Sequence, residues 1–185
     1  MASHAPAQPI QMNTTAQAFT AADVAAILRK HGWLIATTEV RDGSPLQAWL
    51  ARAAELLGPY AASRTGLLKL IFHYDAAEIL LEHASQAVLV RSGAREVIRQ
   101  LANLTLDGGD VDSNRFKEII EAMKAATPYR SRELFQPIRL TLAGRAGEGE
   151  LDRVILLLDT AAKLDLAVAV KSTRQRMLEF CAALD

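Results

Sequence analysis

The feature that most constrains the fold is a succession of short apolar stripes at helical spacing, interrupted by glycine, proline and aspartate. The clearest stripe is made by Phe116, Ile119, Ile120 and Met123. These residues stand at positions i, i+3, i+4 and i+7, so a helix would carry all of them on one face. A second stripe fills residues 46–57 and stops at Gly58-Pro59, a pair that ends helices. Because aromatic residues make up only 5% of the chain, we predict an all-α protein and not a β-sandwich.

Local signals predict where several of these helices begin and end. Thr20-x-x-Asp23 has the spacing of a helix start. Asp75 and Ser92 are candidate caps for the helices that follow them. Pro137 suits the first turn of a later helix, where its missing N–H costs nothing, and Gly144 suits that helix's end.

We expect about eight or nine helices in two packed helical lobes. The expected helical segments are residues 20–31, 46–57, 67–72, 76–81, 92–106, 116–127, 137–143, 154–158 and 166–184. Residues 20–90 form the expected N-terminal lobe, and residues 91–185 form the C-terminal lobe. Residues 1–19 are rich in small and polar residues without apolar periodicity, which predicts a disordered leader.

Charge and cysteine content limit the classes of function. The 21 Lys and Arg residues balance 21 Asp and Glu residues, so the chain lacks the basic excess of strong, sequence-independent nucleic-acid binders. A local basic face is still compatible with this balance. Cys181 is the single cysteine and cannot form an internal disulfide, which favours a reducing, cytoplasmic location. No apolar run approaches the ~20 residues that span a bilayer, so we expect no membrane partner.

The motifs of common enzymes are missing from the sequence. It contains neither a Gly-x-x-x-x-Gly-Lys-Ser/Thr loop nor a Gly-x-Gly-x-x-Gly loop. The Gly-rich residues 144–149 follow a predicted helix and lack the lysine of a phosphate loop. No pair among the four histidines has the spacing of a helical metal site, and Cys181 is best explained by packing. We therefore predict no catalytic residue, no metal and no cofactor, and a protein that is not an enzyme.

Arginine is the residue type that could carry a binding function, since its planar fork pairs with phosphates and base edges. Arg91, Arg95 and Arg99 recur every four residues and would form a basic stripe if they share one helix. A second group comprises Arg130, Arg132, Arg139, Arg145 and Arg153, and is nearly cancelled by Glu133, Glu148, Glu150 and Asp152. A third comprises Lys171, Arg174 and Arg176. The alternative for each group is a solvated helix face with salt bridges.

The segment Leu134-Phe135-Gln136-Pro137-Ile138-Arg139, followed by Leu142-Ala143-Gly144, carries a family resemblance. It is similar to the Leu-Phe-x-Pro-Leu/Ile-Arg-x-Ala-Leu-Thr-Gly run in the C-terminal, anticodon-binding half of bacterial glutamyl-tRNA synthetase. The likeness extends in order over roughly residues 20–160. Nothing in the chain resembles the synthetase's catalytic half. The resemblance implies a stand-alone anticodon-binding domain with two helical lobes.

The resemblance assigns tRNA-binding roles residue by residue. Arg139 occupies the position of an arginine that reads an anticodon base, and Leu151 corresponds to a leucine that packs on the same base. The pair Glu148-Gly149 replaces a Gly-Pro or Thr-Pro pair near the middle base. Tyr60 replaces the arginine that reads the first base, and Arg64, one helical turn later, is a candidate substitute. Two of the three readers are thus altered.

The resulting hypothesis is a noncatalytic tRNA-binding module in which Arg91, Arg95 and Arg99 contact the nucleic-acid backbone. Its implied partners are tRNA, with the glutamate tRNA as a candidate, and a separate synthetase catalytic chain. The rival hypothesis is a protein-interaction or scaffolding module that kept the helical fold and lost tRNA binding. The tRNA hypothesis depends on the Arg139 guanidinium being presented outward, and it fails if that group is folded inward against a carboxylate with no concave positive surface nearby.

Overall fold

The computed structural model describes residues 17–185, and this part of the chain forms ten helices and no strand. The helices are α1 (Ala21–Lys30), α2 (Pro45–Leu57), α3 (Arg64–Phe72), α4 (Ala76–Leu81), α5 (His83–Leu89), α6 (Ala94–Leu106), α7 (Ser113–Ala126), α8 (Ser131–Ala143), α9 (Glu150–Ala161) and α10 (Thr173–Leu184). The predicted all-α class is confirmed, with a helix count close to the expected eight or nine. Most of the predicted leader, residues 1–16, lies outside the described residues.

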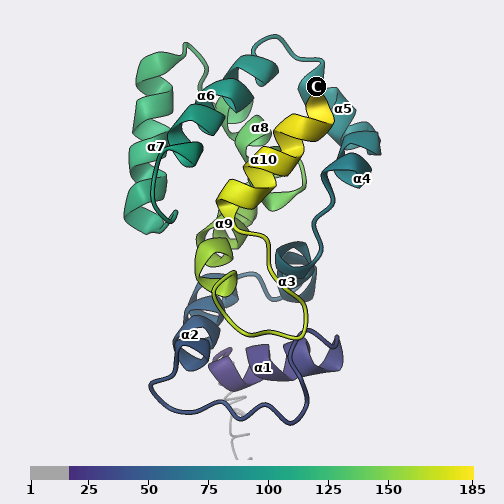
Figure 1. The fold of residues 1–185 in the computed structure, drawn as a ribbon, viewed down its shortest axis with the longest axis vertical. Coiled ribbons are helices and arrows are strands. Elements are labelled where there is room, and N and C mark those ends of the chain that lie inside the picture. The colour runs from purple at the N-terminus through teal and green to yellow at the C-terminus, as the bar shows by residue number, and fades with distance from the viewer. Residues whose placement is uncertain (1–16) are drawn as a thin grey trace, which may run out of the picture.

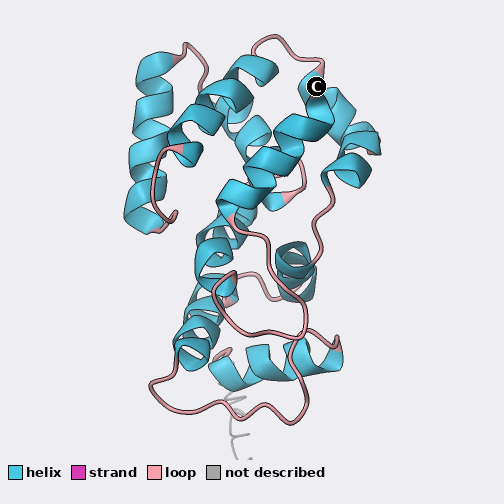
Figure 2. Ribbon diagram, in the orientation of Figure 1, coloured by secondary structure: helices cyan, strands magenta, loops and turns pink. Residues whose placement is uncertain are grey.

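The helices form an elongated body with a different set at each end (Figures 1 and 2). Helices α1, α2 and α3 lie at one end, while α4 to α8 and α10 lie at the other. Helix α9 joins the two ends, because it contacts α2 and α3 as well as α8. The packing of α9 therefore links the helices at the two ends of the body.

The predicted lobe boundary near residue 90 stays a prediction, but the contacts of two short helices bear on it. Helices α4 and α5 fall in the predicted N-terminal lobe, residues 20–90. In the structure α4 packs against α10, and α5 packs against α8 and α6. Both helices therefore lie with the elements of the predicted C-terminal lobe.

Several helix ends follow the predicted local signals. Thr20 accepts a hydrogen bond from the backbone N–H of Asp23, whose carboxylate accepts one from the backbone N–H of Thr20. The Asp75 carboxylate likewise accepts from the first turn of α4. Gly144 ends α8 with φ +80°, a conformation that glycine adopts without steric cost.

Several predicted boundaries are wrong, among them the start of α9 at Glu150 instead of 154, and helix α5 was not among the expected segments. Helix α8 begins at Ser131, so Pro137 lies inside it, because buried Leu134 and Ile138 extend the apolar stripe by a full turn. Ser92 does not cap α6, since Gly93 occupies that position. Helix α10 begins at Thr173 and not near residue 166, because the apolar residues before it are in an extended loop.

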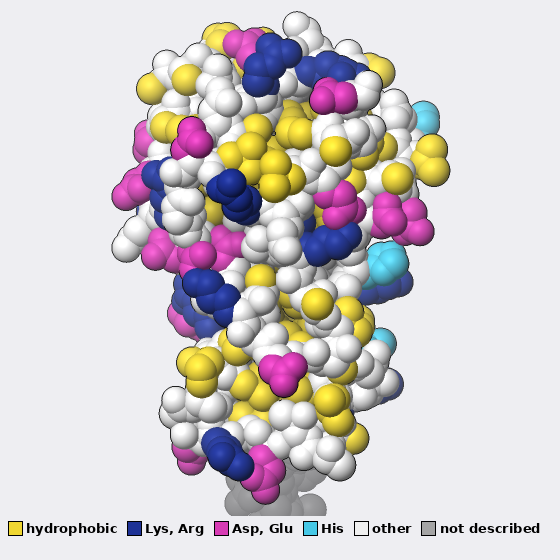
Figure 3. All heavy atoms as spheres, viewed as in Figure 1, with side chains coloured by type: hydrophobic (Ala, Val, Ile, Leu, Met, Phe, Trp, Pro, Cys, Tyr) yellow, Lys and Arg dark blue, Asp and Glu magenta, His cyan; other side chains and the backbone are white. Residues whose placement is uncertain are grey.

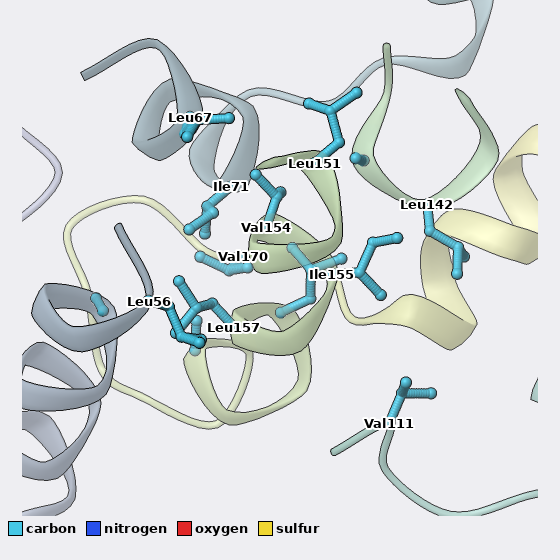
Figure 4. Packing of buried hydrophobic residues seen from close by; sticks show 14 of the residues in the cluster. Leu56, Leu67, Ile71, Val111, Leu142, Leu151, Val154, Ile155, Leu157 and Val170 are labelled. Carbon is cyan, nitrogen blue, oxygen red and sulfur yellow. The ribbon is translucent and has the colours of Figure 1, made fainter. Parts of the chain in front are cut away.

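The core is built around α9. Figure 4 shows side chains from α2, α3, α8 and α9 converging, with those of α9 in the middle. The fully buried apolar residues of α9 are Leu151, Val154, Ile155, Leu157, Leu158 and Ala161. A smaller cluster around Tyr74, Ile98 and Phe180 covers the contact of α10 with α4 and α6. Burial of α9 on several faces thus fixes both ends of the body to one helix.

Arg176 ties helix ends from both sets to α10. Its side chain is fully buried and donates to the carbonyls of Leu142, Leu70 and Ile71 at 2.8–2.9 Å. The guanidinium carbon lies 4.4 Å from the centre of the Tyr74 ring. The sequence placed Arg176 in a solvated basic group, which is wrong, because the unpaired carbonyls at the ends of α3 and α8 bind it in the interior.

None of the helices in residues 17–185 combines the length and the apolar character that crossing a bilayer requires.

Candidate nucleic-acid interface

A hollow of about 360 Å³ lies beside the first half of α8. Its lining residues are Ser131, Arg132, Phe135, Gln136, Arg139 and Glu148. The first five lie on α8, and Glu148 comes from the loop of residues 145–149 that connects α8 to α9. The structure therefore brings two of the predicted tRNA-binding residues, Arg139 and Glu148, into one concave site.

Arg139 does not face outward, so that requirement of the tRNA hypothesis is not met in this structure. Its Nε and one Nη donate to the two carboxylate oxygens of Asp152, at 2.8 and 3.0 Å. Only 11% of the Arg139 side chain and 21% of the Asp152 side chain are exposed. This bidentate, charge-assisted pair neutralises the guanidinium and fixes its plane.

The same guanidinium holds the loop of residues 145–149 against α8. Its other Nη donates to the carbonyl of Gly147 at 3.3 Å, and its carbon lies 5.0 Å from the centre of the Phe135 ring. A Cβ on Gly149 would stand 3.9 Å from Arg139 Nη2, so the loop passes close to it. Arg139 therefore shapes the wall of the hollow.

The exposed charged groups at the hollow are Arg132 and Glu148. Neither makes a hydrogen bond or an ion pair with another side chain in the described part of the chain. Phe135 is half-buried and presents part of its ring. Leu151 is fully buried in the core, so a contact between this side chain and a base does not fit this structure. Gly149 is exposed and precedes the first turn of α9.

Tyr60 and Arg64 lie apart from this hollow. Arg64 donates from Nε to the carbonyl of Leu57 at 3.3 Å, and also binds the carbonyl of Gly58. Its guanidinium lies over the ring of Phe19, 4.1 Å from the centroid. Tyr60 is half-buried in the turn between α2 and α3. Arg64 thus completes the end of α2, and it borders a different hollow with Phe19 and Asp23.

The stripe of three arginines is not continuous on one helix. Arg91 lies in the turn before α6 and donates to the buried amide oxygen of Gln136, below the α8 hollow. Arg95 and Arg99 are exposed on α6 and border a second hollow of about 230 Å³ between α6 and α10. Among the described residues these two arginines have no ion-pair partner. The structure therefore leaves two cations, one turn apart, facing solvent.

Asp152 is the site residue that sequence reasoning missed. It was counted only as a charge that offsets the arginines, whereas it binds Arg139 across 13 positions of sequence. No spacing rule pairs residues at that distance. Phe135, in contrast, belongs to the segment of residues 134–144 that carries the family resemblance, so the sequence pointed to its region.

In residues 17–185 no three His, Cys, Asp or Glu side chains are arranged so as to hold a metal ion. The buried carboxylate of Asp159 accepts hydrogen bonds from the backbone N–H groups of Val111 and Thr173, at 2.6 and 2.7 Å. It also accepts one from the Thr173 hydroxyl at 2.7 Å, so its oxygens are used in joining segments of the fold.

Comparison with curated proteins relates the chain to an aminoacyl-tRNA synthetase. The chain is similar to glutamate–tRNA ligase 2 of Syntrophus aciditrophicus (strain SB), with 24% identity over 110 residues. The match covers 60% of this chain and 23% of that ligase. No model of a protein family matches the chain, and no solved structure does. The similarity supports a relation to that synthetase family, as the resemblance around Arg139 implied.

Proposed function

We propose that the chain is a noncatalytic tRNA-binding module, and that the α8 hollow receives an unpaired base. The proposal rests on one concave site that combines an aromatic ring, a cation and a carboxylate, namely Phe135, Arg132 and Glu148. Within residues 17–185 that cation, Arg132, has no ion-pair partner. Similarity to a protein named as a tRNA ligase supports the choice of nucleic acid as the ligand.

Each lining group has a chemical task in this proposal. The flat surfaces of Phe135 and the Arg139 guanidinium offer stacking to a base. Glu148 accepts a hydrogen bond from an exocyclic amino group, and Arg132 binds a phosphate. Arg139 has five N–H groups, of which three are used by Asp152 and Gly147, so two remain for the hollow. Arg139 then positions the loop of residues 145–149, and its two remaining N–H groups can donate to a base in the hollow.

Arg95 and Arg99 are proposed to contact the phosphate backbone. Both are exposed, and a helix turn separates them, which lets them bind successive phosphates. Tyr60 and Arg64 remain proposed tRNA contacts at a second place on the surface, where Arg64 also binds backbone carbonyls at the end of α2. The proposed partners are tRNA, the glutamate tRNA first, and a separate synthetase catalytic chain, in the cytoplasm.

Titration of fluorescently labelled total tRNA with the protein at low salt, followed by anisotropy, tests the proposal. Arg132→Ala should weaken binding about 5- to 10-fold and reduce the slope of log affinity against log salt by about one. Lys117→Ala is the matched control, since Lys117 is an exposed cation on α7 away from the hollow. Absence of any binding at low salt overturns the proposal, as does an equal effect of the two variants.

A second candidate function is a protein-interaction module. The ion pair that neutralises Arg139 favours it, and so does the surface, where cationic and anionic side chains are interspersed (Figure 3). A largely apolar hollow of about 460 Å³ between α2 and the end of α9 offers a docking surface, lined among others by Ala48, Trp49 and Leu164. Capture of a synthetase chain with no RNA in the complex, after purification at low salt, selects this function.

A further inference from the structure

Three aromatic rings form a continuous column at the end of α1. The ring centroids of His31 and Trp33 lie 4.7 Å apart with an interplanar angle of 17°, and those of Trp33 and Phe72 lie 4.8 Å apart at 5°. The edge of Trp49 closes the inner end of the column, 6.4 Å from the Phe72 centroid and at 83°. Burial falls along the column, from Phe72 (7% exposed) through half-buried Trp33 to exposed His31.

Backbone contacts fix the two outer rings. The N–H of His31 donates to the carbonyl of Ile27 and ends α1, and Gly32 at φ +72° reverses the chain. Trp33 then donates its N–H to the carbonyl of Leu28 at 2.9 Å and accepts at 3.0 Å from the N–H of Ala167. The exposed ring of His31 therefore stacks on a ring whose backbone is already fixed. Binding of a stacked ligand would then cost the protein little conformational entropy.

Two exposed lysines stand near the column in sequence, Lys30 beside the outer ring and Lys69 near the inner ring. Lys30 precedes His31, and Lys69 stands one helical turn before Phe72 on α3. Both lysines are exposed, and neither has an ion-pair partner among the described residues.

We propose that this column is a second RNA contact, at which an unpaired nucleobase stacks on His31 while Lys30 or Lys69 binds an adjacent phosphate. Nucleotides join a flat ring to an anionic group, which matches an exposed stacked ring with a lysine next to it in the chain. An arginine of a protein partner would also stack, but the two lysines repel it. The contact is made by α1 and α3 and not by α8, so it can fail or succeed independently of the proposed function.

Tryptophan fluorescence gives a direct readout, because the chain has two tryptophans and one of them lies in the column. Trp49 is buried, so Trp49→Phe leaves Trp33 as the sole emitter. A short oligoadenylate and an abasic oligonucleotide of the same length are titrated at low salt. Quenching of Trp33 by the oligoadenylate, at concentrations where the abasic strand has no effect, is expected. Should Trp49→Phe fail to fold, the wild-type chain gives the same comparison over a constant background from Trp49.

Variants of His31 separate stacking from simple charge attraction. His31→Ala should weaken oligoadenylate binding about 5- to 100-fold, and His31→Phe should retain it, because a ring still caps the column. His73→Ala, at an exposed histidine outside the column, and Lys117→Ala, at an exposed lysine on α7, should leave the quenching unchanged. Equal binding of the abasic strand overturns the proposal. So does an unchanged affinity of His31→Ala, or a loss in His31→Phe as large as that in His31→Ala.

Discussion

Replacing Asp152 by asparagine should destabilise the fold, because Arg139 would keep a buried charge without its carboxylate. The two hydrogen bonds of the pair measure 2.8 and 3.0 Å, and little of either side chain is exposed, so solvent screens the interaction weakly. Hydrogen bonds to charged groups contribute about 1.5–3 kcal/mol each, and asparagine can still accept one of the two. We expect a loss of about 2–3 kcal/mol in the free energy of unfolding.

A double-mutant cycle isolates the pair from other effects of the substitutions. Arg139→Met keeps the length and apolar contacts of the stem while removing the charge. The double variant should be about as stable as the less stable single variant, which gives a coupling energy of about 2 kcal/mol. Urea denaturation followed by far-ultraviolet circular dichroism measures all four proteins, and the m-value should stay constant. A coupling energy below about 0.5 kcal/mol would show that the pair does not organise the loop.

Three further predictions concern the interior. Arg176→Met should cost about 3 kcal/mol or more in urea denaturation, because three helix-end carbonyls lose their donor; a loss below about 1 kcal/mol contradicts this. Asp159→Asn should cost about 2–3 kcal/mol, since its amide N–H₂ would face donors already aimed at the carboxylate, and an unchanged midpoint refutes that arrangement. Burial raises the pKa of Tyr74 well above its usual range. The unfolded chain therefore loses this proton first as the pH rises, so stability should fall above about pH 10 with a limiting slope of about 1.4 kcal/mol per pH unit. Tyr74→Phe should abolish that part of the slope, and an identical pH profile for the two proteins would be the contrary result.

The parts of the fold that depend on neighbouring residues could be predicted from the sequence. The Thr20 cap, the Asp75 cap and the Gly144 stop act within one helical turn, and each is found where the local pattern indicated. Ser172 and Gln175 form a capping box of the same kind at the start of α10. The apolar residues from 166 onward favour an earlier helix start in sequence, but in the structure they precede the capping box and lie in the loop before α10.

The orientation of charged side chains could not be predicted in this way. Arg139 and Arg176 stand in sequence among other basic residues, and both were assigned to a solvated or ligand-binding surface. Each is buried because partners distant in sequence surround it, namely Asp152 for Arg139 and the carbonyl of Leu70 for Arg176. Such partners meet only after the loops have folded. The position of the candidate site could therefore be predicted from the Leu134–Gly144 segment, but the hydrogen-bond partners of its arginine could not.

Ultraviolet cross-linking of bound tRNA, followed by mass spectrometry of the cross-linked peptides, tests the central claim most directly. The account predicts cross-links in the α8 peptide that contains Phe135, lost when Phe135→Leu removes the ring, because that ring lines the hollow proposed to receive a base. Bound tRNA that cross-links elsewhere on the chain, with none in residues 131–148, would contradict it.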